Sequence, residues 1–147
     1  MFPEKPRVVI DTGVVVSRLL RPDSIPGQAV ALAQRKATLL ISQETMAELL
    51  EVLTRPKFAP YINADDLTDI IQALAGIAEV IHVSVKISVC RDPDDDKLLA
   101  LAATGGANFI ITSDDDLLVL NPFGNVAIVT PRQFVDGYGE GSPHAGT

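Results

Sequence analysis

Acidic side chains recur along this chain where apolar segments begin or end, at Asp11, Glu48, Asp96 and the pair Asp114 and Asp116. Carboxylate oxygens are the ligands that Mg²⁺ and Mn²⁺ prefer in proteins. Two such ions about 3.5–4 Å apart can generate a hydroxide and stabilise a leaving oxygen, which is the chemistry of phosphodiester hydrolysis. Without cations these carboxylates would repel one another, so the set predicts a divalent-metal site.

Five short apolar runs, most of them rich in β-branched residues, predict the strands that would position these acids. They are Val8–Ile10, Leu39–Ile41, Val80–Val85, Phe109–Ile111 and Val126–Val129. Helical segments alternate with these runs, which predicts an α/β fold with a mostly parallel sheet covered on both faces. Ligands of such sheets bind beyond the carboxyl ends of the strands, and Asp11 and Asp114 each come just after a predicted strand.

Three helices are expected between the strands. Apolar residues with helical spacing follow the candidate cap Ser42 (Met46, Leu49, Leu50, Leu53) and the candidate cap Asn63 (Leu67, Ile70, Ile71, Leu74). The segment 55–60 separates the two, because a residue that precedes proline is disfavoured in a helix. A third helix is predicted from about Pro93 to Thr104, ending at Gly105-Gly106.

Length and composition indicate a single domain over residues 7–136, followed by a tail, 137–147, that lacks an apolar pattern and is expected to be flexible. The formal net charge of −7 argues against a protein that holds a polyanion by a basic patch alone, so nucleic acid binding would need cations. Cys90 is the only cysteine, which excludes an intramolecular disulfide and fits a reducing cytoplasm. No apolar run is long enough to span a membrane, and we expect a soluble protein.

Each acid also has a purely structural interpretation. Asp11 suits a cap or turn at the exit of its strand, and Asp114 or Ser113 suits the N-cap of a short helix. The first turn of the helix that begins at Pro93 accounts for Asp92, Asp94 and Asp95, and leaves Asp96 less well explained. Glu48 lies on the helix side opposite the apolar stripe, where a solvated position is the simpler interpretation.

Other motifs fit less well. The segment 92–97 begins like an EF-hand loop, but Lys97 stands where the loop requires glycine. Asp11-Thr12-Gly13 matches the catalytic turn of aspartic proteases, whose all-β fold would not hold the predicted helices. A receiver-like Mg²⁺ module would need a lysine after a late strand, where this chain has Thr130-Pro131-Arg132.

Four segments together resemble the PIN-domain family of metal-dependent ribonucleases, which includes the toxins of VapBC-type toxin–antitoxin pairs. They are Arg7 to Thr12, Glu48 to Phe58, Arg91 to Ala102 and Thr112 to Leu118. The resemblance covers about residues 7–136. It implies a three-layer α/β/α fold with a five-stranded, mostly parallel sheet.

The resemblance also implies a site and partners. Asp11, Glu48, Asp96 and Asp114 would be the acidic quartet that binds Mg²⁺ or Mn²⁺, with Asp116 as a supporting ligand and the Thr112 hydroxyl close to the metal or the scissile phosphate. The expected substrate is RNA, and the expected partners are a cognate antitoxin and a second copy of the chain in a homodimer.

One residue departs from the family pattern, because Gly13 stands where the family usually has Asn after Asp-Thr. An Asn there can orient the neighbouring carboxylates, and its loss would lower metal affinity or rate. Gly13 therefore motivates a competing hypothesis, a catalytically weak module that keeps the metal pocket and acts through RNA or protein contacts.

Overall fold

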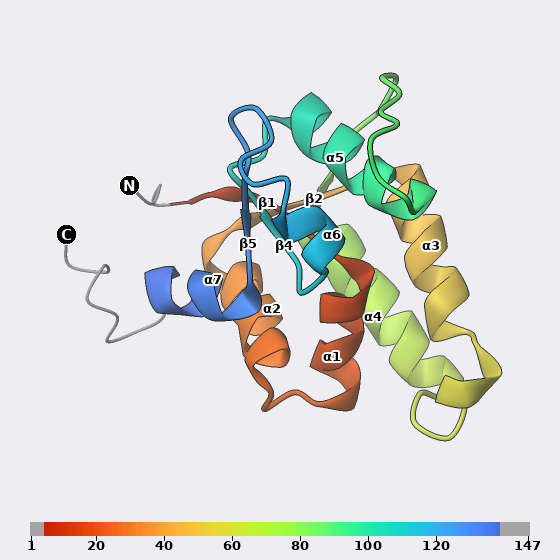
Figure 1. Ribbon diagram of the computed structural model, residues 1–147. Helices are drawn as coiled ribbons and strands as arrows, with labels where there is room; N and C mark the ends of the chain where they lie inside the picture. Colours follow the sequence, from red (N-terminus) through yellow and green to blue (C-terminus); the bar gives the residue numbers. More distant parts are fainter. Residues whose placement is uncertain (1–4, 139–147) are drawn as a thin grey trace.

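The computed structural model describes residues 5–138, and between residues 73 and 77 it describes the backbone alone (Figure 1). In chain order the elements are β1 (Arg7–Ile10), α1 (Thr12–Leu20), α2 (Ile25–Lys36), β2 (Thr38–Ile41), α3 (Gln43–Leu53), the 3-10 turn η1 (Pro56–Phe58), α4 (Ala64–Ile77), β3 (Ala78–Val80), α5 (Pro93–Gly105), β4 (Phe109–Ile111), α6 (Asp115–Leu118), β5 (Ala127–Val129) and α7 (Pro131–Tyr138). No helix in this part of the chain is both long and apolar enough to cross a membrane.

The five strands form one parallel sheet in the order β3-β2-β1-β4-β5. Strand β1 lies at the centre, where Val8 pairs with Leu39 of β2 and with Phe109 of β4. Because all strands run the same way, their carboxyl ends meet at one edge of the sheet. That edge receives the chain segments that begin at Asp11 and Thr112.

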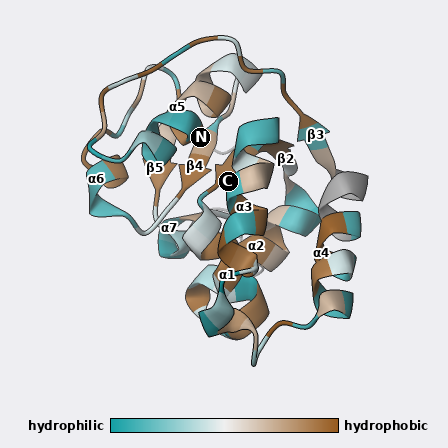
Figure 2. Cartoon of the chain, turned by 90° about the vertical axis from the view of Figure 1, so that its right-hand side faces the viewer, coloured by the Kyte–Doolittle hydropathy of each residue, from teal (hydrophilic) through white to brown (hydrophobic). Residues whose placement is uncertain are grey.

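Helices cover both faces of the sheet, as the predicted three-layer α/β/α fold requires. Alternate residues of β1 point to opposite faces, so Val8 joins one core cluster and Val9 the other. The first cluster packs the sheet against α1, α2, α3, α4 and α7, and the second packs it against α5 and α6. Figure 1 shows α5 on one side of the sheet and α2 and α7 on the other, and Figure 2 shows the hydrophobic strands β4 and β5.

The predicted helix caps are confirmed. The Ser42 hydroxyl accepts the Thr45 N–H at 3.1 Å, and the Thr45 hydroxyl accepts the Ser42 N–H at 2.9 Å, which closes a capping box at the start of α3. Asn63 Oδ1 accepts the Asp66 N–H at 2.8 Å ahead of α4. The stripe residue Leu74 lies outside the side chains that the structure describes.

Helix α5 also begins and ends as predicted. Asp92 caps it through a bond from the Asp94 N–H, Pro93 stands in the first turn, and Gly106 ends it with φ +64°. That left-handed conformation carries little steric cost for glycine, which has no Cβ.

The segment predicted as a strand at Val80–Val85 differs from the structure, in which β3 spans Ala78–Val80. The neighbouring strand β2 ends at Ile41, and the Ile81 N–H makes a last bond to the Ile41 carbonyl at 2.7 Å. Beyond that point the alternating apolar side chains Val83 and Ile87 still pack on the second core cluster, but without a strand to pair with. Periodicity alone therefore extended the prediction beyond the available partner.

Three α-helices, α1, α2 and α7, and the short turn η1 are outside the predicted set. Helix α1 contains Gly13 and Val14-Val15-Val16, residues with modest or poor helix propensity, so burial against the sheet must stabilise it. Helix α7 includes Gly137 and Tyr138, both buried, which extends the folded domain two residues past the predicted boundary. The rest of the predicted tail, 139–147, lies outside the described residues.

Candidate metal centre at the carboxyl edge of the sheet

Asp11 and Thr112 are brought together because they follow the adjacent strands β1 and β4. The Asp11 N–H bonds the Ile111 carbonyl at 3.0 Å, which continues the pairing one residue beyond the strands. The fully buried Thr112 hydroxyl donates to Asp11 Oδ2 at 2.7 Å and accepts the Asp114 N–H at 3.0 Å. Thr112 therefore fixes two of the expected site acids relative to each other.

Three carboxylates form a compact group beside this pair. One oxygen each from Asp95, Asp114 and Asp116 lies within 4.8 Å of the others. The Asp116 N–H donates to Asp114 Oδ1 at 2.9 Å, so Asp114 is oriented by the backbone of α6. Oxygens coordinated to one Mg²⁺ are separated by roughly 3–4 Å, since Mg–O distances are about 2.1 Å. The group therefore has the ligand type and spacing for a divalent cation.

The protonation of these acids reflects crowding in a partly dry site. Burial is the largest cause that raises the pKa of Asp95 to about 7, followed by the hydrogen bond and the negative charge of Asp114. Burial also raises the pKa of Asp11, and the bond from Thr112 opposes that change. Each raised pKa means that the negative charge of the carboxylate is not balanced by a nearby positive charge. A bound cation would supply that positive charge.

Glu48 joins the site from α3. Its side chain is partly buried, and burial raises its pKa, with further upward contributions from Asp94 and Asp11. The Thr12 side chain acts in the opposite direction. Glu48 is therefore near enough to Asp94 and Asp11 for their charges to act on it, and it does not occupy a fully solvated helix face, the simpler interpretation of its spacing.

Asp11, Glu48 and Asp96 are expected acids that lie outside the compact group of Asp95, Asp114 and Asp116, and Asp96 has other hydrogen-bond partners. Its Oδ1 accepts the Val89 and Cys90 N–H groups, both at 2.9 Å, and these bonds lower its pKa. Successive helix residues are rotated by about 100°, so Asp95 and Asp96 cannot both face the same point. The structure places Asp95 with Asp114 and Asp116, while Asp96 holds the segment ahead of α5.

The sequence contains no pattern that separates Asp95 from Asp96. Helix α5 is buried at Asp95, Asp96 and from Leu98 to Ala102, so it has no polar face from which a direction could be read. Asp95 also suits the first turn of a helix on electrostatic grounds, which supplies a sufficient local explanation for it. Only the packing of Leu98, Leu99 and Leu101 against the sheet, which sets the rotation of α5, determines which of the two meets Asp114.

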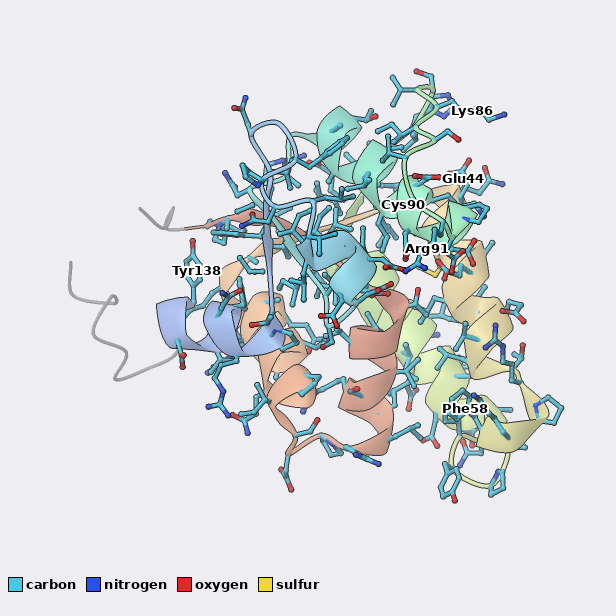
Figure 3. The ribbon with its side chains drawn as sticks, viewed as in Figure 1. Glu44, Phe58, Lys86, Cys90, Arg91 and Tyr138 are labelled. Atoms are coloured by element: carbon cyan, nitrogen blue, oxygen red, sulfur yellow. The ribbon has the colours of Figure 1, made fainter. Side chains whose placement is uncertain are left out.

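A cation contacts the group from the segment ahead of α5. An Arg91 side-chain nitrogen lies 2.6 Å from Asp116 Oδ1, and Figure 3 shows this side chain reaching from that segment. The side chain is 86% exposed, so the ion pair lies at the mouth of the site.

Carboxylates from separate segments therefore converge at the carboxyl edge of a parallel α/β sheet, an arrangement that could hold a divalent cation. The profile of the PIN domain matches residues 7–116, and the chain belongs to the PIN domain family, a family of nucleases that generally use divalent metals. The chain is 30% identical over 144 residues to the uncharacterized protein MJ1680 of Methanocaldococcus jannaschii. The alignment covers 91% of this chain and 92% of that protein.

Solved structures share the fold at low sequence identity. A chain of VapBC2 from Rickettsia felis, bound to a DNA fragment from its promoter, superposes with a TM-score of 0.58 at 14% identity, covering 84% of this chain and 98% of that one. PAE2754 from Pyrobaculum aerophilum superposes with a TM-score of 0.56 at 14% identity, covering 90% and 88%. At these identities the likeness concerns the fold alone.

Proposed function

We propose that this protein is a Mg²⁺- or Mn²⁺-dependent ribonuclease that hydrolyses RNA phosphodiester bonds. The observation that carries the proposal is the convergence of Asp95, Asp114 and Asp116 within 4.8 Å, next to an Asp11 that is fixed by Thr112. We assign Asp11, Asp95, Asp114 and Asp116 to the metal, with Glu48 at its edge. Asp95 takes the place that the family resemblance gave to Asp96, because Asp96 is bonded to Val89 and Cys90.

The residues present fit a hard divalent cation. All are oxygen donors, and the crowded acids lack a buried positive partner among the described residues. A bound cation supplies an activated water and neutralises charge that develops on the phosphate.

The protein residues have separate parts in that chemistry. The Thr112 hydroxyl keeps Asp11 and Asp114 at a fixed separation, so the ligands are arranged before the substrate arrives. The Glu48 carboxylate, on which the charge of Asp11 acts, would accept the proton of an attacking water. Burial raises the pKa of Glu48, which makes its carboxylate a stronger base than that of a free Glu side chain.

The test is cleavage of a panel of structured and single-stranded RNAs with Mn²⁺, with Mg²⁺ or with EDTA. Asp95→Asn and Asp114→Asn should abolish cleavage. Asp65→Asn should not, because it removes the same charge from an exposed position on α4. Cleavage that survives EDTA, or equal activity in the Asp95 and Asp114 variants, would refute the proposal.

A second candidate function rests on Gly13. A Cβ at that position would meet nothing within 4 Å, so the side chain that is usual in the family is missing and nothing fills its space. RNA binding without cleavage by the purified protein would favour this metal-keeping binding module. The Thr112 bond to Asp11 favours the nuclease, because together with the bond from the Gly13 backbone N–H (3.4 Å) it orients Asp11 without a side chain at residue 13.

We further propose that the chain is the toxin of a toxin–antitoxin pair, that it acts in the cytoplasm and that it forms a homodimer. The fold shared with a chain of VapBC2 motivates the first point. Expression should arrest growth in a manner that depends on Asp114, and co-expression of a small protein encoded next to this chain should restore growth. Light scattering at several concentrations tests the dimer.

A further inference from the structure

Arg91 is the cation that meets the acidic group. Among the described residues, it alone forms an ion pair with Asp95, Asp114 or Asp116, through the 2.6 Å contact with Asp116. Its side chain is 86% exposed, so water surrounds most of the guanidinium. Exposed pairs of this kind contribute about fivefold or less to an equilibrium constant. A divalent cation that binds Asp116 can therefore displace Arg91 readily.

The position of Arg91 is nevertheless well defined, because residues on both sides of it are anchored. Asp96 Oδ1 holds the N–H groups of Val89 and Cys90, and Asp92 caps α5. A guanidinium released from Asp116 would therefore stay at the mouth of the metal centre. Its planar array of donors matches a phosphate in a bidentate manner.

A groove continues from this point along the surface. Its volume is about 730 Å³, and its lining includes Arg91, Lys86 and Lys97 together with the apolar Val83 and Ile87. Figure 3 shows Lys86, Cys90 and Arg91 in succession along the segment between β3 and α5. Glu44 and Asp96 also line the groove, so its acids offset part of the positive charge of Lys86, Arg91 and Lys97.

The charge of the chain makes such a residue necessary. With a net charge of −7, the protein repels a polyanion at long range, and a bound metal ion offsets that repulsion only at the acids themselves. We infer that Arg91, once the metal ion has taken Asp116, binds an RNA phosphate next to the cleaved bond, and that Asp96 is the positioning residue that holds it there. This inference rests on the proposed ribonuclease function.

Two binding measurements on the full chain test it. Mn²⁺ affinity is measured by calorimetry, and binding of a fluorescein-labelled single-stranded RNA is measured by anisotropy with Ca²⁺ over a range of salt, with a gel to verify that the RNA is intact. Arg91→Ala should tighten Mn²⁺ binding by up to about fivefold, because a competitor is removed. The same variant should weaken RNA binding about tenfold and reduce the salt slope by about 0.7, the value for one phosphate contact.

Matched variants separate a phosphate contact from general damage. The RNA affinity of Arg91→Lys should fall between that of wild type and that of Arg91→Ala. Arg35→Ala removes an exposed charge near the amino ends of the strands and should change neither affinity. Asp96→Asn should weaken RNA binding in the wild-type background and have no added effect on top of Arg91→Ala.

These measurements distinguish failure of the Arg91 inference from failure of the proposed ribonuclease function. Unchanged RNA binding and salt slope in Arg91→Ala, with a wild type that cleaves RNA, would overturn the inference alone. Weakening of both Mn²⁺ and RNA binding in Arg91→Ala would also overturn it, since that is the result of a structural role. A wild type that neither binds nor cleaves any RNA would overturn both.

Discussion

Replacing Asp95 by Asn should stabilise the metal-free protein and remove its response to Mn²⁺. Burial and the nearby Asp114 raise the pKa of Asp95 to about 7, against a value of 3.8 for a free Asp side chain. Because the folded state binds this proton more tightly than the unfolded state does, stability falls as the pH rises from about 4 to about 7. Above pH 7 the full cost of the charged form is present.

The magnitude follows from that difference in pKa. At 1.36 kcal/mol per unit, a shift from 3.8 to about 7 corresponds to about 4 kcal/mol. Relative to wild type, Asp95→Asn should therefore raise the free energy of unfolding by roughly 2 kcal/mol at pH 5 and by roughly 4 kcal/mol at pH 8. Urea unfolding of both proteins in EDTA at the two pH values measures the difference.

Asp96→Asn is the matched control, because it changes the neighbouring residue in the same way. The pKa of Asp96 is lowered by the bonds from Val89 and Cys90, so its charged form stabilises the fold at neutral pH and loses that effect in acid. The Asn variant should be less stable than wild type at pH 7 and should keep the stabilisation by Mn²⁺. If Asp95→Asn destabilises the protein at pH 8, or if Mn²⁺ still raises its unfolding midpoint as in wild type, the assignment of Asp95 is refuted.

Three further variants test the rest of the site. Thr112→Val should lower the free energy of unfolding in urea by about 1–3 kcal/mol, because it leaves Asp11 Oδ2 and the Asp114 N–H without the hydroxyl that joins them. A loss below about 0.5 kcal/mol would contradict that role. Glu48→Gln should weaken Mn²⁺ binding about tenfold in calorimetry. An unchanged Mn²⁺ affinity would mean that Glu48 takes no part in metal binding. Gly13→Asn should leave the unfolding free energy within about 0.5 kcal/mol, since a Cβ there has open space; a larger loss would mean that residue 13 needs glycine.

The layers of the fold were predictable because their signals are local. The caps at Ser42, Asn63 and Asp92 each require only residues within one turn, and all three are present in the structure. Helix α1 was not predictable in this way, because its valines and Gly13 favour other conformations. What stabilises it is the burial of Val14 and Val16 against the first core cluster, and that depends on distant parts of the chain.

The site was predictable to the level of the segment but not of the residue. Asp11 and Asp114 follow strands directly, so the parallel pairing of β1 and β4 was enough to predict that they meet. In α5 the direction of each acid depends on how far the helix is rotated about its axis. That rotation is set by contacts of Leu98, Leu99 and Leu101 with the sheet, which no local pattern encodes.

The acidic charge of the site and the expected polyanionic substrate together imply an order of binding. With three carboxyl groups close together and Arg91 held on Asp116, the mouth of the site offers a phosphate no free guanidinium. A divalent ion changes both conditions at once, because it neutralises the acids and releases the guanidinium. Metal and RNA binding should therefore be coupled, and by thermodynamic linkage RNA should tighten Mn²⁺ binding by the same factor that Mn²⁺ tightens RNA binding. Arg91 transmits part of that coupling, so Arg91→Ala should reduce the factor even though it improves binding of the metal alone.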